Sequence, residues 1–278
     1  MRQNVLLCRM ENDVMPVQPR LASTVMLLRD AESGPAGIEV FMVQRAVQSE
    51  FMPNLYVFPG GSVSPDDHRA EETAGLCKPV APTASDPEGR TALGSGARAA
   101  AIRELFEEAN VLLAYRNGEM LTINEETAAR FTGYRQAFNE RKGSLVEMAQ
   151  SELLVLATDH LAYFAHWITP EGLPKRYDTH FFLATAPLEQ EAAYDQLETS
   201  DGVWIRPADA LDRFKRGEIP IAFPTFHQLR DLSAFRTVQE ALDAAALRHV
   251  ATHLPILTQK DGKPHVYLPE DAENAWKI

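Results

Sequence analysis

The sequence has few cysteines, no long apolar run and a shortage of positive charge, and each of these absences excludes a class of protein. The two cysteines among 278 residues, Cys8 and Cys77, cannot form a disulfide framework and lack the spacing of metal ligands. No apolar run reaches the roughly 18 residues of a membrane-spanning helix. Residues 1–16 lack the apolar core of a signal peptide, so we expect a cytoplasmic protein without a membrane partner.

The charge balance is acidic, with 27 Lys and Arg residues against 39 Asp and Glu residues and a formal net charge of −12. Such a chain is unsuited to non-specific nucleic-acid binding, so we expect no nucleic-acid partner. It would also repel a phosphorylated substrate at long range. If the substrate is anionic, a metal ion or a local group of basic side chains must attract it.

Apolar runs and turn residues predict a mixture of strands and helices. Strands are expected at residues 21–29, 38–45 and 56–58 and in the stretches FAHWITP, THFFLATAP and GVWIRP. Helices are expected at residues 97–109, in 124–150, in PADALDRFKRGE and in the tail from 225 to about 253. Because the strands come as hairpin-like neighbours, the pattern favours an α+β fold or an α/β/α sandwich with a mixed sheet.

The predicted organisation is one main domain with additions. Residues 62–96 are so rich in Pro, Gly, Ser and Asp that we expect an irregular loop rather than a helix. The predicted parts are an N-terminal arm (1–19), a main domain (20–224) with a loop insert at about 68–96 and a helical insert at about 124–150, and a helical C-terminal extension (225–278) packed on it.

The stretch RELFEEANV, residues 103–111, holds three glutamates within five positions. At 3.6 residues per turn, one face of this helix is an apolar stripe formed by Ile102, Leu105, Phe106 and Ala109. A different face carries the carboxylates of Glu104, Glu107 and Glu108. Asn110 follows the stripe, where a residue with left-handed backbone conformation commonly ends a helix.

Two interpretations of the glutamates are open. A solvent-exposed acidic face is the more common meaning of such a cluster. The alternative is a site for hard divalent cations, which prefer carboxylate oxygens and would give an acidic protein a phosphate-binding surface. Gly60 and Gly61 follow the predicted strand at 56–58, after Pro59. Alone they indicate a turn, but beside a carboxylate helix they would form the other wall of a site, since glycine lets a ligand approach the backbone closely.

These residues resemble the box of the Nudix hydrolases, G-x5-E-x7-R-E-U-x-E-E-x-G-U, in which U is a bulky aliphatic residue. Gly61 and Asp67 fit its first part, with Asp in place of Glu, and residues 103–111 fit its second part, with Asn110 in place of Gly. Between the two parts lie 35 residues, 68–102, where the usual box has seven. The resemblance implies a Nudix-type α/β/α sandwich with a mixed sheet and a long insert within the box.

The resemblance also implies a metal-dependent cleavage of a diphosphate joined to a second group. By position, Glu104, Glu107 and Glu108 match metal-binding glutamates for Mg²⁺ or Mn²⁺. The backbone of Gly60 and Gly61 would line the metal and the diphosphate.

Two further box residues are given supporting roles by the resemblance. Arg103 would hold the glutamates by ion pairing, and Asp67 would be structural rather than catalytic. A carboxylate outside the box, in the loop before GVWIRP, is often used as well, and Glu198 is favoured over Asp201 for this role. The general base that activates the attacking water is Glu107, Glu108 or Glu198.

The split box and the segments around it resemble one branch of the family, which contains peroxisomal acyl-CoA diphosphatases and bacterial relatives. CoA carries several phosphates, so a basic substrate pocket is expected, with Arg45, Lys175 and Arg176 as candidates. The alternatives are another nucleoside diphosphate derivative (NADH, ADP-ribose or a diadenosine polyphosphate) and a catalytically silent Nudix-fold binding module. The resemblance leaves a homodimer open.

The sequence does not predict a metal site at the histidines. His166 and His180 each lie in an apolar strand context, which favours core or pocket histidines over metal ligands. His249 and His253 are four residues apart but lack a third ligand nearby in the sequence.

Overall fold

The computed structural model describes residues 17–277 except 33, 35, 49–52, 88–95, 196–197, 261 and 275. Most of the predicted N-terminal arm, including Cys8, lies outside the described residues. Cys77 is a free cysteine. None of the helices in the described part of the chain combines the length and the apolar character that a membrane crossing requires.

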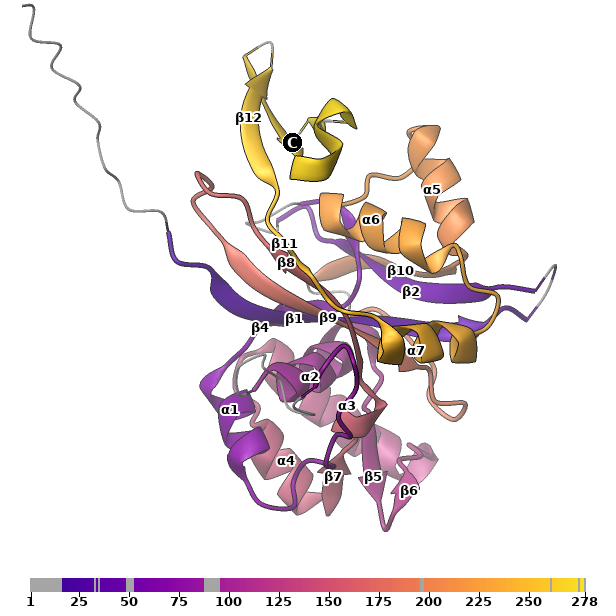
Figure 1. Cartoon of the computed structure of the whole chain (residues 1–278). Helices are drawn as coiled ribbons and strands as arrows, with labels where there is room; N and C mark the ends of the chain where they lie inside the picture. The colour runs from indigo at the N-terminus through magenta and orange to yellow at the C-terminus, as the bar shows by residue number, and fades with distance from the viewer. Residues whose placement is uncertain are drawn as a thin grey trace, which may run out of the picture.

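The centre of the molecule is an eight-stranded mixed sheet (Figure 1). Its main strand order is β10-β2-β1-β9-β8-β11, with β3 paired to β2 and β4 paired to β1. The β1–β9 and β8–β11 pairs are parallel, and the other pairs are antiparallel. The strands are β1 (Arg20–Asp30), β2 (Ile38–Arg45), β3 (Tyr56–Val57), β4 (Gly60–Ser62), β8 (Ala162–Ile168), β9 (Tyr177–Thr185), β10 (Thr199–Ile205) and β11 (Thr252–His253).

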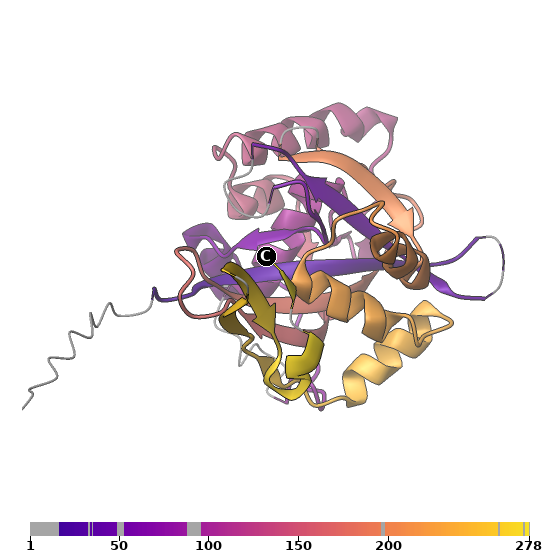
Figure 2. The ribbon, with the colours of Figure 1, turned by 90° about the horizontal axis from the view of Figure 1, so that it is seen from above.

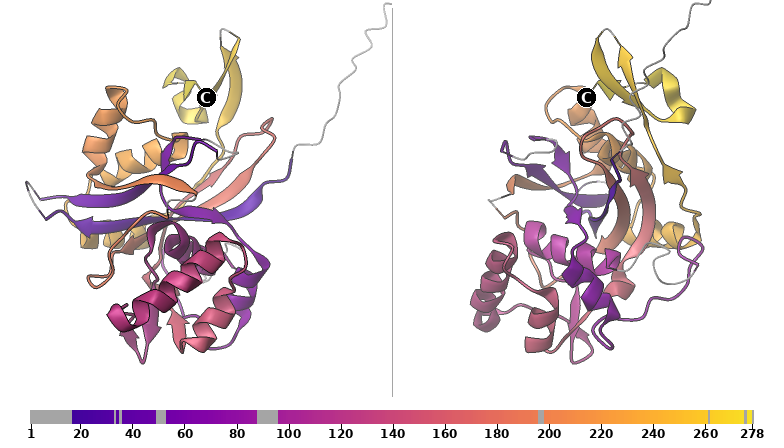
Figure 3. Two further views of the ribbon diagram at one scale, coloured as in Figure 1. Left: turned by 180° about the vertical axis from the view of Figure 1, so that it is seen from behind. Right: turned by 90° about the vertical axis from the view of Figure 1, so that its left-hand side faces the viewer.

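Helices cover both faces of this sheet, which confirms the predicted sandwich (Figures 1 and 3). On one face lie α1 (Pro65–Glu72), α2 (Ala97–Ala109), α3 (Glu125–Asn139) and α4 (Leu145–Ser151). On the other lie α5 (Pro207–Lys215), α6 (Phe223–Leu232) and α7 (Val238–Leu247). Successive residues of β1 from Val25 to Leu28 are all 0% exposed. A strand whose two faces are both covered has an unbroken apolar run instead of alternation.

The α2 stripe lies in the core between the sheet and the helices. Ile102, Leu105, Phe106 and Ala109 are fully buried there with Val25 and Leu27 of β1. Asn110 ends the helix at φ 60°, in the left-handed conformation expected for it.

The residues expected to be helical within 124–150 form α3 and α4. Asn124 caps α3, its side chain accepting a hydrogen bond from the Thr127 N–H at 3.1 Å. A three-stranded sheet flanks these helices, in the order β6 (Glu119–Met120), β5 (Ala114–Arg116) and β7 (Leu154–Leu156).

Two expectations are wrong. Residues 65–72 form helix α1 rather than loop, because Ser64 and Asp67 build a capping box and Pro65 stands at the first helical position. The C-terminal extension is helical only as far as Leu247. It then forms β11 and a separate three-stranded sheet, in the order β12 (Ile256–Lys260), β13 (Lys263–Tyr267) and β14 (Trp276–Lys277), which Figure 2 shows from above.

Candidate active site

The first half of the site is the turn from β4 into α1. Asp67 is 0% exposed, and its Oδ2 accepts hydrogen bonds from the Ser64 N–H at 2.7 Å and from the Ser64 hydroxyl at 2.8 Å. Asp67 thereby holds the start of α1. This placement agrees with the structural role that the family resemblance gave it.

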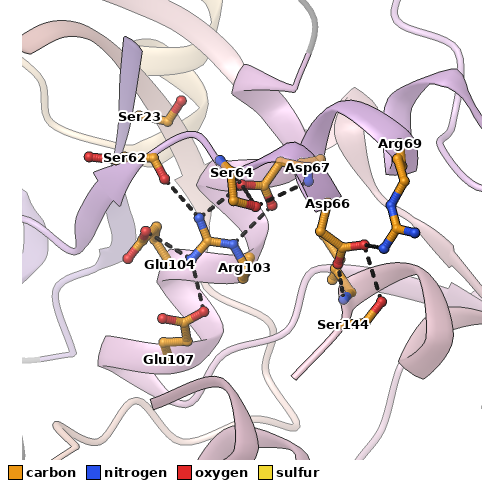
Figure 4. A network of polar contacts seen from close by, with 12 residues as sticks. Ser23, Ser62, Ser64, Asp66, Asp67, Arg69, Arg103, Glu104, Glu107 and Ser144 are labelled. Carbon is orange, nitrogen blue, oxygen red and sulfur yellow. Dashed lines mark hydrogen bonds and ion pairs between the residues drawn. The ribbon is translucent and has the colours of Figure 1, made fainter. Parts of the chain in front are cut away.

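Arg103, on α2, is the centre of the polar network (Figure 4). Its Nε and Nη2 donate to the two oxygens of Asp67, each at 2.9 Å. Its Nη1 donates to Glu104 at 2.9 Å and to Glu107 at 2.8 Å, and Nη2 also donates to the Ser62 carbonyl at 3.0 Å. One guanidinium therefore joins both halves of the box and fixes two of its three glutamates.

The two glycines bring the backbone of β4 against the carboxylates. The Gly60 N–H donates to Oε2 of Glu108 at 3.0 Å. A Cβ on Gly61 would lie 2.4 Å from Oε1 of Glu104, and a Cβ on Gly60 would lie 2.4 Å from the Ser23 carbonyl oxygen. Only glycine allows this close approach, so the Gly-Gly pair is more than a turn.

The glutamates are not a solvent-exposed acidic face. Glu104 is 8% exposed and Glu108 5% exposed. Burial raises the pKa of Glu104 to about 7, with Arg103 opposing the rise and Glu107 adding to it. Burial also raises the pKa of Glu107, and it raises that of Glu108 well above its ordinary value, helped by the adjacent Glu104. Removing these carboxylates from water stabilises their neutral forms.

This arrangement fits a divalent cation. Three crowded carboxylates offer the hard oxygen donors that Mg²⁺-like ions prefer, and burial, together with the neighbouring carboxylates, raises the pKa of each of them. A bound cation would supply the missing positive charge and hold the carboxylates deprotonated.

Glu198, the residue before β10, and Arg45, the last residue of β2, lie next to each other. The Ala46 N–H donates to the Glu198 carbonyl at 2.9 Å, and Thr199 pairs with Arg45 in the ladder. Among the causes that act on the pKa of Glu108, the charge of Glu198 raises it and that of Arg45 lowers it. The structure therefore brings both predicted residues close to the box.

Lys175 and Arg176 are not brought to the glutamates. They directly precede β9, whose first residue pairs with Arg20, whereas Gly60 and Gly61 pair with Thr24 and Ser23 further along β1. Arg176 is buried, and its guanidinium donates to the main-chain carbonyls of Thr169 at 3.0 Å and Val17 at 2.8 Å. Arg176 therefore links the segment before β1 to the residue that follows β8, and its assignment to substrate binding stays a prediction.

The interruption of the box leaves the site intact. Glu71, at the end of α1, accepts hydrogen bonds from the backbone N–H groups of Gly96, Arg98 and Ala99 and so caps the start of α2. Further along the insert, Asp86 pairs with buried Arg98 of α2 at 2.6 Å. Glu71 and Asp86 thus fix the insert to the helix that carries the carboxylates.

One supporting residue was missed by the sequence analysis. Arg135, on α3, donates to the Glu107 carbonyl at 2.8 Å and to the Ala193 carbonyl at 2.7 Å. It ties the C-terminal half of α2 to the loop before β10. Its place in a charged helix gave no signal for this contact.

Comparisons with known proteins agree with this geometry. A family model described as the NUDT19 Nudix domain matches residues 19–232. A Gallus gallus protein named acyl-coenzyme A diphosphatase NUDT19 is 30% identical over 268 residues, which cover 82% of this chain and 71% of that protein. The Xenopus laevis protein of the same name is 26% identical over 275 residues, covering 86% of this chain and 72% of that protein.

A solved structure has the same fold. The crystal structure of a Nudix hydrolase from Alicyclobacillus acidocaldarius matches with a TM-score of 0.65 and 26% identity, covering 81% of this chain and 96% of that one. Together with the matched family model and the carboxylate site built on α2, this shows that the chain belongs to the NUDT19 Nudix domain family and is a pyrophosphohydrolase of the Nudix class.

Proposed function

We propose that this chain hydrolyses the diphosphate of CoA or acyl-CoA, giving 3′,5′-ADP and phosphopantetheine or its acylated form. The observation that carries the chemistry is the buried cluster of Glu104, Glu107 and Glu108, held by Arg103 against the glycine backbone. The choice of substrate is supported by the relatives from Gallus gallus and Xenopus laevis, both named acyl-coenzyme A diphosphatases.

Nudix hydrolases require divalent metal ions, and we assign this role to Mg²⁺ or Mn²⁺ at the three glutamates and the backbone of Gly61. When bound there, such an ion would supply positive charge to offset that of the diphosphate. Arg103 is a positioning residue, because its guanidinium is occupied by carboxylates and a carbonyl. Arg45 and the backbone of Gly60 are the substrate-binding groups of this proposal, with exposed Lys175 as a more distant contact for a long substrate.

We assign the general base to Glu198. Glu104 and Glu107 are engaged by Arg103, and Glu108 accepts the Gly60 N–H. Glu198 is exposed at the start of β10, and its charge acts on Glu107 and Glu108 from outside α2. Its carboxylate accepts the proton of a water molecule as the oxygen attacks one phosphorus, and the P–O bond to the leaving phosphate breaks. Glu107 and Glu108 remain the alternatives, as the sequence left them.

The test is a substrate panel incubated with Mg²⁺ and, separately, with Mn²⁺. The panel contains CoA, acetyl-CoA, NADH, ADP-ribose and diadenosine polyphosphates, with products identified by mass. Release of 3′,5′-ADP together with a phosphopantetheine supports the proposal and locates the cleaved bond. Selective cleavage of another compound replaces the substrate and keeps the chemistry, whereas no turnover despite measured metal binding favours a silent binding module.

A cytoplasmic location stays a prediction from the sequence, and a homodimer stays open. Light scattering of the purified chain measures the oligomeric state directly.

A further inference from the structure

Three ligand-type side chains meet on the sheet outside the box. His166 on β8, with Asp178 and His180 on β9, place one ligand atom each so that all three atoms lie within 4.8 Å of one another. The Nε2 of His166 lies 2.5 Å from Oδ1 of Asp178, and the Nε2 of His180 lies 3.7 Å from the same oxygen. These three residues are called the His-Asp-His cluster below.

The register of the β8–β9 hairpin creates this cluster. His166 pairs directly with His180, and Asp178 is two residues before His180 on the same face of β9. The two imidazole rings stack with centroids 4.4 Å apart and an interplanar angle of 14°. Both rings therefore present the same edge toward one carboxylate.

The opposite edge of each ring is fixed by a hydroxyl group. The Nδ1 of His180 lies 3.1 Å from the Tyr163 hydroxyl, and the Nδ1 of His166 lies 2.8 Å from the Thr252 hydroxyl. When a histidine binds a metal through Nε2, its Nδ1 carries the proton and donates it to an outer partner. Both histidines have such a partner, so both Nε2 atoms can be free of protons together.

A hydrogen-bonded His-Asp pair alone does not account for the arrangement. Oδ1 of Asp178 is within hydrogen-bond distance of His166, but at 3.7 Å it is too far to bond His180. His180 is nevertheless aimed at it from a buried position.

The cluster is open on one side and distinct from the box. The side chains of His166 and Asp178 are 16% and 32% exposed, whereas that of His180 is 5% exposed, so an ion could enter from solvent and keep water in a fourth position. His180 pairs with Ser23, which pairs in turn with Gly61, so β1 separates the cluster from the glycines of the box.

We propose that the His-Asp-His cluster is a second metal site, for a transition-metal ion of the Zn²⁺ or Co²⁺ type. Two imidazoles and one carboxylate suit these ions, whereas the all-oxygen set of the box suits Mg²⁺ or Mn²⁺. The ligands come from two paired strands, and the outer partner Thr252 comes from β11, where the chain rejoins the sheet after α7. An ion here stabilises the β8–β9 pair and, through Thr252, the attachment of the C-terminal extension.

The test is equilibrium dialysis of the full chain against Zn²⁺, with excess Mg²⁺ present to fill the box. Four variants are compared with the wild type: His166→Gln, Asp178→Asn, Thr252→Val and the box double variant Glu104→Gln/Glu108→Gln. Exposed His160→Gln is the matched control. Circular dichroism confirms that each variant is folded.

The expected result is one bound Zn²⁺ per chain in the wild type, in the control and in the box double variant. Affinity should fall by about 10–100-fold in Thr252→Val, which removes an outer partner, and by more in His166→Gln and Asp178→Asn, which each remove a ligand. Zn²⁺ should raise the melting temperature of the wild type but not of His166→Gln. Three results would overturn the proposal. The wild type could fail to bind Zn²⁺, the bound Zn²⁺ could persist in His166→Gln and Asp178→Asn, or it could be lost only in the box double variant.

Discussion

Asp67 and Arg103 form a buried bidentate ion pair, with both N–O distances at 2.9 Å, although 35 residues separate them in the chain. The pair explains how the box works in two pieces. Asp67 is shorter than the usual glutamate by one methylene, and its position at the third residue of α1 brings it within reach of the guanidinium. The second half of the box is then oriented by Arg103 rather than by sequence proximity.

The first prediction concerns this pair. Asp67→Asn removes the charge that Arg103 faces and one acceptor of the α1 capping box, while the arginine stays buried. Breaking a buried ion pair in this way should cost about 3 kcal/mol or more of unfolding free energy. Chemical denaturation measures the loss, and turnover should fall with it because Arg103 no longer fixes Glu104 and Glu107.

The matched control is Asp212→Asn, which removes an exposed partner of Lys215. Surface pairs contribute about 0–1 kcal/mol, so its stability should change little. Equal effects of the two variants would contradict the bridging role of Asp67.

The second prediction separates the general base from the metal ligands. Glu198→Gln should lower kcat by about 10²–10⁴-fold, the usual contribution of a general base, while leaving Mn²⁺ affinity unchanged. Glu108→Gln should weaken Mn²⁺ binding as well as turnover. Calorimetric titration and steady-state kinetics give the two readouts, and exposed Glu191→Gln is the control. If Glu198→Gln turns over normally, the base belongs to Glu107 or Glu108 instead.

The third prediction is a pH dependence of the metal-free protein. The folded-state pKa of Glu104 is about 7, above its ordinary value of 4.5, so between these values the folded state binds more protons than the unfolded state. Stability from this group is therefore fully present below about pH 4.5 and is lost as the pH rises through 7. Glu104→Gln removes the titration.

The measurement compares unfolding free energies of the wild type and Glu104→Gln in the presence of a chelator. The two should be similar at pH 5, and the variant should be more stable at pH 8, by at most about 3 kcal/mol. Added Mg²⁺ should stabilise the wild type at pH 8 and the variant much less. Parallel pH profiles of the two proteins would show that the buried carboxylate is not the cause.

The parts of the fold that the sequence predicted are those set by local patterns. The stripe on α2, the left-handed Asn110 and the central strands follow from periodicity and from the residue that ends a helix. The tail strands had a local signal that was overlooked, because Asp261-Gly262 between two runs with strand character is a hairpin signature. Helix α1 also has a capping signal in its sequence, formed by Ser64, Pro65 and Asp67. The many loop-forming residues around it favoured the loop prediction instead.

Other features depend on contacts that no local pattern encodes. The burial of Glu104 and Glu108 results from the approach of β4 to α2, and the engagement of Arg176 by two main-chain carbonyls results from its place beside Val17 and Thr169. His166 and His180 lie in two separate strand patterns of the sequence. They come close to Asp178 only through the register of β8 against β9, which local sequence patterns do not determine.

The fourth prediction uses the two glycines, which should fail in different ways. In Gly61→Ala the new methyl group meets the end of the flexible Glu104 side chain, which can move aside, so turnover and metal affinity should fall more than stability. In Gly60→Ala it meets the Ser23 carbonyl in the β1 backbone, which cannot move freely, so unfolding free energy should fall by about 1–3 kcal/mol. The control is Gly133→Ala on α3. Nothing lies within 4 Å of its added Cβ, and alanine favours a helix by up to about 1 kcal/mol relative to glycine, so neither stability nor metal affinity should fall. Denaturation and Mn²⁺ titration of the three variants provide the comparison. If Gly61→Ala binds Mn²⁺ like the wild type, then the space that this glycine leaves for Glu104 is not needed to shape the metal site.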